Sequence, residues 1–324
     1  MTTVVPVTGN PAHSKPVGSA DYEVVIVTYH SCDELEALVA QARDDQRIVV
    51  VDNSSGVDGT KGVVARFSAG RWFDGGGNGF AKAANLGART SAADYLIFAN
   101  PDCRPTPEIW DELIDDLRRD PDLGLVGVGA ADDSGRLELG IGGWEPTMWR
   151  TFVYAFGLHR IFPNAGVYAR PRTGEDIELD WLGAPCLAVR RDLFLELGGF
   201  DERYFLYNDD MELGRTLRAH GKKLLLRTDL HVPHAGAGSG GEGTSMFQQR
   251  GTSMAEYLLY HNGTGAAAVM RGMLVLGAVP RAIVALLRRR RSLARQQRAY
   301  MAGLITRRSP YRPQSPELTL IERQ

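Results

Sequence analysis

Short, almost continuous apolar runs alternate with helical patterns along the first 130 residues. The apolar runs are rich in Val, Ile and Leu, the composition of buried strands, and comprise residues 23–29, 47–55, 93–103 and 123–130. Helical spacing of apolar residues occurs between them, at 33–43, 80–90 and 107–119. Strands that are apolar throughout and alternate with helices predict an α/β fold, with a mostly parallel sheet covered by helices on both faces.

Polar residues follow each of the first three predicted strands. They are Thr28 and Tyr29, then Asp52, Asn53 and Ser54, and then Asn100, Pro101 and Asp102. Ligands of open parallel sheets bind at the carboxyl ends of the strands, so we expect a binding site at this edge. The glycine-rich stretch DGGGNG, residues 74–79, could bring backbone N–H groups near a phosphate. It matches neither a Walker loop nor GxGxxG after a strand, and a plain surface loop is an equal alternative.

The second half of the chain is less regular. Residues 136–180 are rich in Gly, Trp and Pro and predict a long excursion from the sheet. Residues 182–205 predict a strand, a short helix and a turn. Residues 222–241 predict a strand that runs into a glycine-rich loop carrying His231 and His234.

Three carboxylates lie within four residues where an aromatic run becomes a helical pattern, in YFLYNDDMELGRTLRAHG at 204–221. In a structural interpretation, Asp209 is the N-cap, Glu212 completes a capping box and Gly221 ends the helix. This interpretation gives Asp210 no role. Because neighbouring carboxylates repel one another, Asp210 is a candidate for chemistry.

Composition indicates a soluble globular protein. The 324 residues are 44% hydrophobic and 23% charged. Three scattered cysteines form no CxxC pair, which favours a reducing, cytoplasmic compartment. The start of the chain has no basic and apolar stretch of the signal-peptide kind. We expect a loose tail at 1–20, one domain at 21–262 and a basic helical extension at 263–324.

The predicted extension is strongly basic. Residues 257–316 contain eleven Arg and neither Lys nor acidic residues. Pro280 and Arg281 interrupt its apolar runs, so we do not expect a transmembrane helix. A basic amphipathic segment at 273–300 is typical of binding to an anionic membrane surface. A helix packed on the body and homo-oligomerisation are alternatives; nucleic-acid binding is disfavoured, because interleaved aromatics are absent.

Six motifs follow one another along the chain. They read VVIVTYH, VVDNSS, NGFAKAANLG, NPDC, WLGAPCLAVRRDLFLELGGFDERYFLYNDDMELGRTLRAHG and VPHAGAGS. This order resembles that of family 2 glycosyltransferases of the GT-A fold, in particular bacterial rhamnosyltransferase-like members, over roughly residues 22–262. The resemblance implies inverting transfer of a sugar from a nucleotide-diphosphate donor, assisted by Mn²⁺ or Mg²⁺. It favours dTDP-L-rhamnose as donor, with a UDP- or GDP-sugar as the alternative, and a glycan or polyprenyl-linked acceptor.

The resemblance also implies roles for individual residues. Asp210 corresponds to the catalytic base, and Asp209 to its acidic neighbour. A carboxylate can accept the proton that an acceptor hydroxyl loses as it attacks. Asp102 and His234 correspond to metal ligands, where a divalent cation would neutralise the leaving diphosphate. The DxD motif of the family reads Asn100-Pro101-Asp102 here and keeps only its last Asp.

Further positions are implied to bind the two substrates. Asp52 and Asn53 would contact the base or ribose, and Tyr29 beside Thr28 would stack on the base. Asn78 and Asn85 would contact the donor, with structural capping as an equal alternative. The sugar and acceptor pocket is implied to include Trp181, Gly183 and Ala184.

Two other classes of function remain open. A nucleotidyltransferase needs a glycine-rich basic loop directly after the first strand, and TYHSCDELEA lacks one. An inactive nucleotide-sugar-binding module would keep the donor contacts without needing Asp210. Activity therefore depends on whether the candidate residues come together in one site.

Overall fold

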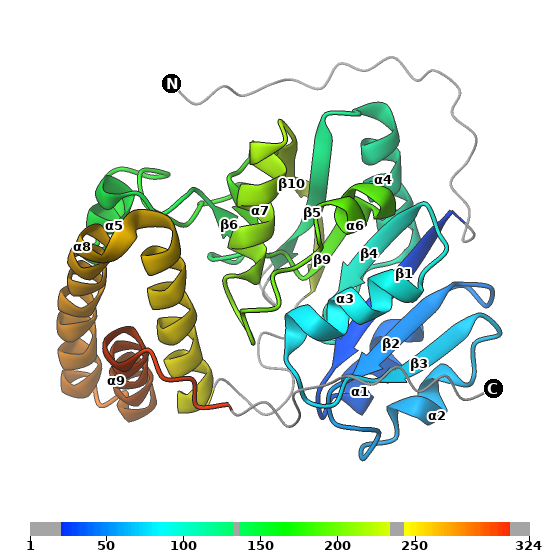
Figure 1. The fold of residues 1–324 in the computed structure, drawn as a ribbon, viewed down its shortest axis with the longest axis horizontal. Coiled ribbons are helices and arrows are strands. Elements are labelled where there is room, and N and C mark those ends of the chain that lie inside the picture. Colours follow the sequence, from blue (N-terminus) through cyan, green and yellow to red (C-terminus); the bar gives the residue numbers. More distant parts are fainter. Residues whose placement is uncertain (1–20, 132–135, 234–242, 312–324) are drawn as a thin grey trace.

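The computed structural model describes residues 21–131, 136–233 and 243–311. Its centre is a mostly parallel eight-stranded sheet, as predicted (Figure 1). In spatial order the strands are β3 (Gly70–Asp74), β2 (Ile48–Asp52), β1 (Tyr22–Thr28), β4 (Tyr95–Ala99), β9 (Cys186–Arg190), β5 (Leu123–Ala131), β10 (Lys223–Pro233) and β7 (Ile177–Glu178). Only β9 and β7 run antiparallel to their neighbours in this sheet. A small second sheet pairs β6 (Gly142–Gly143) with β8 (Trp181–Leu182).

Both faces of the central sheet are buried under helices, which is why its strands are apolar throughout. Along β1, Val24 and Ile26 belong to one apolar cluster and Val25 to another, because successive side chains point to opposite faces. The first cluster includes residues of α1 (Cys32–Val39), α2 (Thr60–Val64) and α4 (Pro107–Arg119). The second includes residues of α3 (Phe80–Thr90), α6 (Arg191–Glu196) and α7 (Asp209–Ala219).

The predicted elements differ from the observed ones mainly at their ends. The helix predicted at 33–43 ends at Val39, and the strand predicted at 47–55 ends at Asp52. The edge strand β3, GRWFD, was not predicted. Its residues are only half-buried and lack an apolar run, so the pattern of a buried strand is missing from the sequence.

A helical unit packs beside the sheet (Figure 1). It consists of α5 (Met148–Ala155), the 3₁₀ turn η1 (Leu158–Arg160), α8 (Thr244–Leu287) and α9 (Arg291–Thr306). Gly263, with φ of 72°, bends α8 so that its halves lie side by side with α9 against them. The predicted domain boundary between 262 and 263 falls at this bend. One apolar cluster crosses it, joining Met270 and Leu304 to Trp181 and Met211.

The sequence predicts that Pro280 and Arg281 interrupt the apolar runs of this segment; the helix itself continues through both residues. The buried Gly277, Ala278 and Ala282 hold this part of the helix against its neighbours, which compensates for the one N–H that proline lacks. By length and composition alone, α8 is long and apolar enough to cross a membrane. One third of its most apolar window is buried inside the protein.

Replacing Gly277 should destabilise the protein, because the absence of a side chain at this position allows α8 to pack closely against α5. A Cβ atom at Gly277 would lie 2.1 Å from the carbonyl oxygen of Ala155. We expect Gly277→Ala to lower the free energy of unfolding by about 1–3 kcal/mol. Gly272→Ala is the matched control on the same helix: nothing lies within 4 Å of its Cβ position. It should raise the free energy of unfolding by about 0.5–1 kcal/mol. Urea denaturation measures both; equal stabilities would contradict the close contact.

Candidate active site

The acidic cluster begins in a left-handed turn. Tyr207 and Asn208 have φ of 67° and 66°, in the left-handed region that residues other than glycine rarely adopt. Asn208 is the N-cap of α7, so Asp209 is the first helical residue and the predicted capping box is wrong. The Nδ2 of Asn208 donates to the sulfur of Met211 at 3.0 Å. Strained residues of this kind cluster at functional sites, because the surrounding structure must hold them in place.

Glu212 has a structural role. Its carboxylate accepts from the Tyr204 hydroxyl at 3.3 Å and lies 2.7 Å from Nε2 of His261. Since His261 is on α8, the contact ties α7 to the helical unit. The predicted helix end is confirmed: Gly221 has φ of 72°, and its N–H donates to the carbonyl of Arg218.

Asp209 and Asp210 form a buried, interacting pair. Burial and repulsion from Asp210 raise the pKa of Asp209. Burial also raises the pKa of Asp210, but less, because backbone N–H groups and the Arg250 guanidinium favour its ionised form. The Asp210 carboxylate accepts from the N–H of Met211 at 2.8 Å. The pair as a whole therefore holds a proton more readily than two separate carboxyls, and the contacts of Asp210 favour it as the ionised member.

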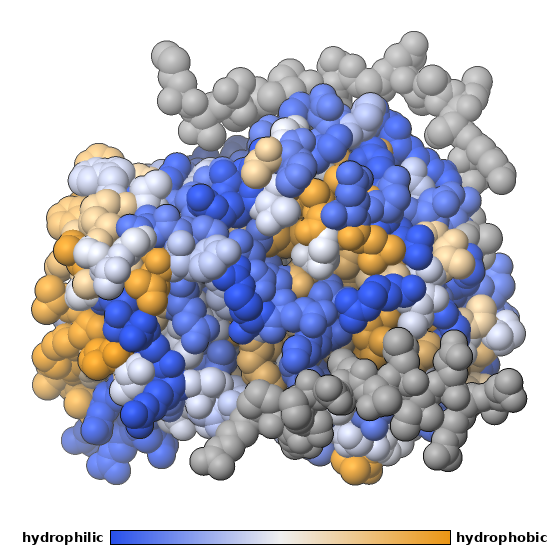
Figure 2. All heavy atoms as spheres, viewed as in Figure 1, coloured by the Kyte–Doolittle hydropathy of each residue, from blue (hydrophilic) through white to orange (hydrophobic). Residues whose placement is uncertain are grey.

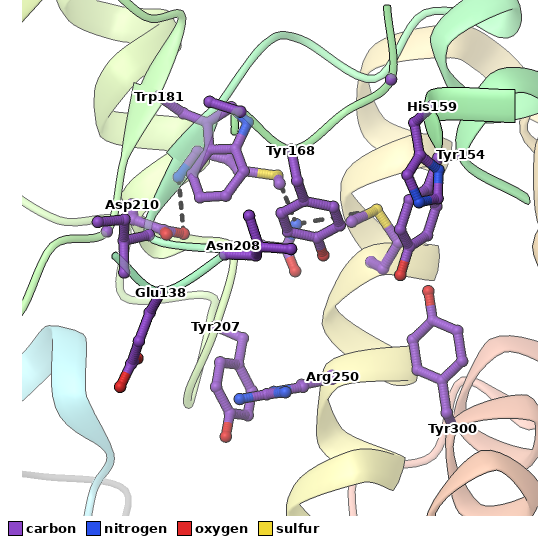
Figure 3. Close-up of a pocket in the computed structure, with 18 of the residues that line it drawn as sticks. Glu138, Tyr154, His159, Tyr168, Trp181, Tyr207, Asn208, Asp210, Arg250 and Tyr300 are labelled. Atoms are coloured by element: carbon purple, nitrogen blue, oxygen red, sulfur yellow. Dashed lines mark hydrogen bonds between the residues drawn. The ribbon is translucent and has the colours of Figure 1, made fainter. Parts of the chain in front are cut away.

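A cavity of about 590 Å³ opens beside Asp210 and extends into the helical unit (Figure 3). Trp181 and Gly183 line it, as predicted, whereas Ala184 packs in the sheet core. A Cβ atom at Gly183 would lie 2.2 Å from Oδ2 of Asp210. The absence of a side chain there leaves room for the carboxylate at the mouth of the cavity.

The opposite end of the cavity is aromatic and basic. Asp210 lies at one end in Figure 3, and Tyr154, His159 and Tyr300 gather at the other. Arg281 lines the same end. Sequence reasoning missed all four of these residues. The only signal was the concentration of aromatic residues and His159 in the excursion at 136–180, and nothing in the sequence joins it to α8 and α9.

The carboxyl end of β2 is organised by a buried carboxylate. Asp52 is fully buried and accepts from the N–H groups of Ser54 and Gly56 at 3.0 and 2.6 Å. The hydroxyls of Thr28 and Thr60 also donate to it, each at 3.1 Å. Burial opposes ionisation, but these hydrogen bonds lower the pKa of Asp52 overall. Asp52 and the fully buried Thr28 hold the loop after β2. The contact of Asp52 with the base or ribose stays a prediction.

Neighbouring residues at this edge are better placed for a ligand. Tyr29 is 53% exposed. Asn53 donates to the carbonyl of Gly79 at 3.1 Å, and Asn78 to that of Gly75 at 3.2 Å. Within the described part of the chain, the side-chain oxygens of both asparagines are buried without a hydrogen-bond partner. Two unsatisfied acceptors beside one glycine-rich loop are typical of a site that receives donors from a ligand.

Asn85 does not share this arrangement. Its Nδ2 donates to the carbonyl of Phe200 at 2.8 Å, and its Oδ1 accepts from the N–H of Phe200 at 2.9 Å. The same Nδ2 lies 3.0 Å from the Glu202 carboxylate. Asn85 thus joins α3 to the turn after α6, which favours the structural alternative for this residue; its donor contact stays a prediction.

The candidate metal site is only partly described. Asp102 follows β4 as a half-buried carboxylate, a hard oxygen ligand of the kind that Mg²⁺ and Mn²⁺ accept. The second predicted ligand, His234, lies outside the described residues. Over 21–131, 136–233 and 243–311, no group of three candidate ligands gathers in one place. A cation at Asp102 would need ligands beyond these described groups.

Comparisons with known proteins identify the family of the chain. Residues 23–170 match the family model described as "Glycosyl transferase family 2". The N-acetylglucosaminyl-diphospho-decaprenol L-rhamnosyltransferase of Mycobacterium tuberculosis is 32% identical over 231 residues, which are 61% of this chain and 70% of that protein. The O-antigen biosynthesis protein RfbC of Myxococcus xanthus is 28% identical over 159 residues, 46% of this chain and 12% of its own length.

Solved structures show the same fold. The mannosyltransferase PcManGT from Pyrobaculum calidifontis, in complex with GDP-Man and Mn²⁺, matches with a TM-score of 0.57 at 15% identity, covering 90% of this chain and 88% of that one. GalNAc-T7 with UDP, GalNAc and Mn²⁺ matches with a TM-score of 0.52 at 14% identity, covering 86% and 54%. The chain belongs to the family 2 glycosyltransferases: it is a glycosyltransferase of the GT-A fold that is similar to bacterial rhamnosyltransferases.

Proposed function

We propose that the protein transfers L-rhamnose from dTDP-L-rhamnose to a sugar hydroxyl of a lipid-linked cell-envelope acceptor, with inversion at the anomeric carbon. The observation that carries this proposal is the position of Asp210 at the mouth of a large cavity beside the sheet. The similarity to a rhamnosyltransferase whose name contains diphospho-decaprenol supports both the sugar and the acceptor class. A UDP- or GDP-sugar donor is the alternative.

In this proposal Asp210 is the general base. The acceptor hydroxyl enters from the cavity and attacks the anomeric carbon as its proton passes to the Asp210 carboxylate. The bond to the nucleotide diphosphate breaks on the opposite side, which inverts the configuration. The protonated neighbour Asp209 avoids a second negative charge at the site, so that Asp210 can remain ionised.

The donor occupies the carboxyl ends of β1, β2 and β4. The exposed ring of Tyr29 stacks on the base, and the unpartnered oxygens of Asn53 and Asn78 accept from the nucleoside. Asp102 would hold a divalent cation together with the donor, as Lewis acid for the leaving diphosphate. Two proteins of the same fold carry Mn²⁺ with a nucleotide or nucleotide sugar, which supports this part of the proposal.

Nucleotide binding can be measured by thermal shift. We expect dTDP to raise the melting temperature more than UDP or GDP, and to do so more strongly with Mn²⁺. At a hundredfold excess over Kd a ligand stabilises the native state by about 2.7 kcal/mol. Tyr29→Ala should reduce the shift, whereas Tyr260→Ala, at a 63% exposed position on α8, should not. A larger shift with UDP than with dTDP would favour a UDP-sugar over dTDP-L-rhamnose as the donor. No shift with any nucleotide would contradict the donor site.

The two aspartates should differ sharply when each is replaced by asparagine. Asp210→Asn removes the base and should lower kcat by about 10²- to 10⁴-fold. Asp209→Asn replaces a protonated carboxyl by a neutral group of the same shape, so it should preserve the melting temperature and lose far less activity. Steady-state kinetics and thermal melts of both variants test this. Greater loss in Asp209→Asn than in Asp210→Asn would reverse the assigned roles.

The protein carries a surface suited to a membrane. Exposed apolar residues follow one face of the second half of α8, and we call them the apolar helix face: Leu276, Val279, Ile283, Leu286 and Leu287. Figure 2 shows apolar residues gathered at this edge of the molecule. The exposed Arg288, Arg289, Arg290 and Arg291 follow directly. Apolar area beside arginines matches an anionic lipid surface, where each arginine contributes about 1 kcal/mol. We therefore infer peripheral binding to the inner face of the plasma membrane.

Vesicle sedimentation tests this surface. We expect binding to vesicles that contain phosphatidylglycerol, weaker binding to phosphatidylcholine alone, and loss of binding at high salt. Leu286→Glu with Leu287→Glu should reduce binding without destabilising the protein, because these side chains are 56% and 78% exposed. Gly272→Ala on the same helix is the control. If the double variant only converts a dimer into a monomer, the apolar helix face is an interface between two copies instead.

A further inference from the structure

Two buried nitrogen atoms at the basic end of the cavity have no partner in the described structure. They are Nη2 of Arg281 on α8 and Nδ1 of His159 in η1. Both residues line the cavity. The charged donor Nη2 of Arg281 costs free energy when it is buried without an acceptor, and Nδ1 of His159 is a further donor when it carries a proton. Such an arrangement is expected where a ligand supplies the missing acceptor.

The two side chains are held in place by one aromatic ring. The Arg281 guanidinium lies 5.3 Å from the ring centroid of Tyr154, and the His159 ring stacks on Tyr154 at 5.8 Å. The Nε of Arg281 donates to the carbonyl of Gly277 at 2.9 Å, which fixes the direction of the guanidinium. Figure 3 shows the hydroxyls of Tyr154 and Tyr300 pointing toward one another beside His159. These contacts build a rigid pocket of hydrogen-bond donors.

The charges around this pocket favour an anion. Arg170 also lines the cavity, and burial together with the positive charges of Arg170 and Arg281 lowers the pKa of His159. The acidic residues of the cavity, Glu138 and Asp210, lie at its opposite end in Figure 3. The cavity is thus acidic where a hydroxyl must lose its proton and basic where a charged group would be bound.

We propose that Arg281 and His159 form a subsite for the phosphate groups of the acceptor, so that a sugar linked to a lipid through a diphosphate lies with its hydroxyl at Asp210 and its diphosphate at Arg281. The planar guanidinium and the adjacent imidazole match the acceptor-only oxygens of a phosphate. The assignment of the diphosphate to an acceptor rests on the proposed function, whereas the anion subsite does not.

Farnesyl diphosphate is a probe of this subsite, and farnesol is the matched probe of its apolar tail. Titrations of the full chain are made with saturating dTDP and Mg²⁺, so that the donor site is occupied. We expect farnesyl diphosphate to bind more tightly than farnesol. Arg281→Gln and His159→Gln should each weaken the binding of the diphosphate by about 10- to 100-fold and leave farnesol unchanged. Arg281→Lys should have an intermediate effect, because it keeps the charge and loses the fork of donors.

Arg119→Gln is the control, since this arginine is exposed on α4 and does not line the cavity. Equal binding of farnesyl diphosphate and farnesol, or equal affinity in wild type and Arg281→Gln, would overturn the subsite. Transfer kinetics separate this outcome from failure of the proposed function. With a farnesyl-diphosphate-linked acceptor sugar, Arg281→Gln should raise KM, while KM for a neutral alkyl glycoside of the same sugar stays unchanged. If the binding of farnesyl diphosphate depends on Arg281 but no sugar is transferred, the anion subsite is supported and the proposed acceptor is wrong.

Discussion

The site depends on holding two neighbouring carboxylates, Asp209 and Asp210, buried at the start of α7, directly after the left-handed turn at Tyr207 and Asn208. Both the repulsion and the backbone conformation oppose this placement, so other contacts must stabilise it. Those contacts come largely from the first half of α8. The hydroxyl of Ser253 donates to the carbonyl of Leu206 at 2.8 Å, and His261 lies 2.7 Å from Glu212. The first half of α8, which the sequence places within the domain at 21–262, therefore supports the candidate site.

This dependence explains why the cavity lies between the sheet and the helices. The sheet supplies the donor edge and the acidic turn, and α5, α8 and α9 supply the opposite wall. The Tyr257 hydroxyl donates to Glu145 at 2.8 Å, and Arg215 and Arg218 bind the same carboxylate at 2.9 and 2.7 Å. Such a network, partly shielded from water, fixes the two walls relative to one another more firmly than isolated surface ion pairs do.

The sequence was sufficient for the parts of the fold that follow from local pattern. The apolar strands and the helices at 80–90 and 107–119 agree with the structure. The sequence was insufficient where a polar residue at a strand end can either be buried in the fold or face a ligand. Strand ends locate the binding edge, but they do not reveal that Asp52 is buried under four donor residues while Asn53 beside it keeps an unpaired oxygen.

Other residues of the site could not be found from local sequence at all. Arg281 appeared as one of many arginines in a basic segment, and His159 as one residue of an irregular excursion. More than 120 positions separate them, and only the packing of α5 on α8 brings them to the same cavity. Pro280 illustrates the same limit, because tertiary contacts keep the helix intact where local propensity predicts a break.

Under the proposed function, the apolar helix face, the basic end of the cavity and Asp210 bind successive parts of one acceptor molecule. Its basic end is built from η1 and from α8 close to the apolar helix face, so a lipid tail can leave toward a membrane while its phosphates meet Arg281 and His159. The sugar then extends toward the acidic end, where Asp210 lies. A reversed acceptor would place phosphates against a carboxylate and leave the buried nitrogens unpaired, at a cost for each. Electrostatics alone thus selects which end of the acceptor reaches the donor sugar.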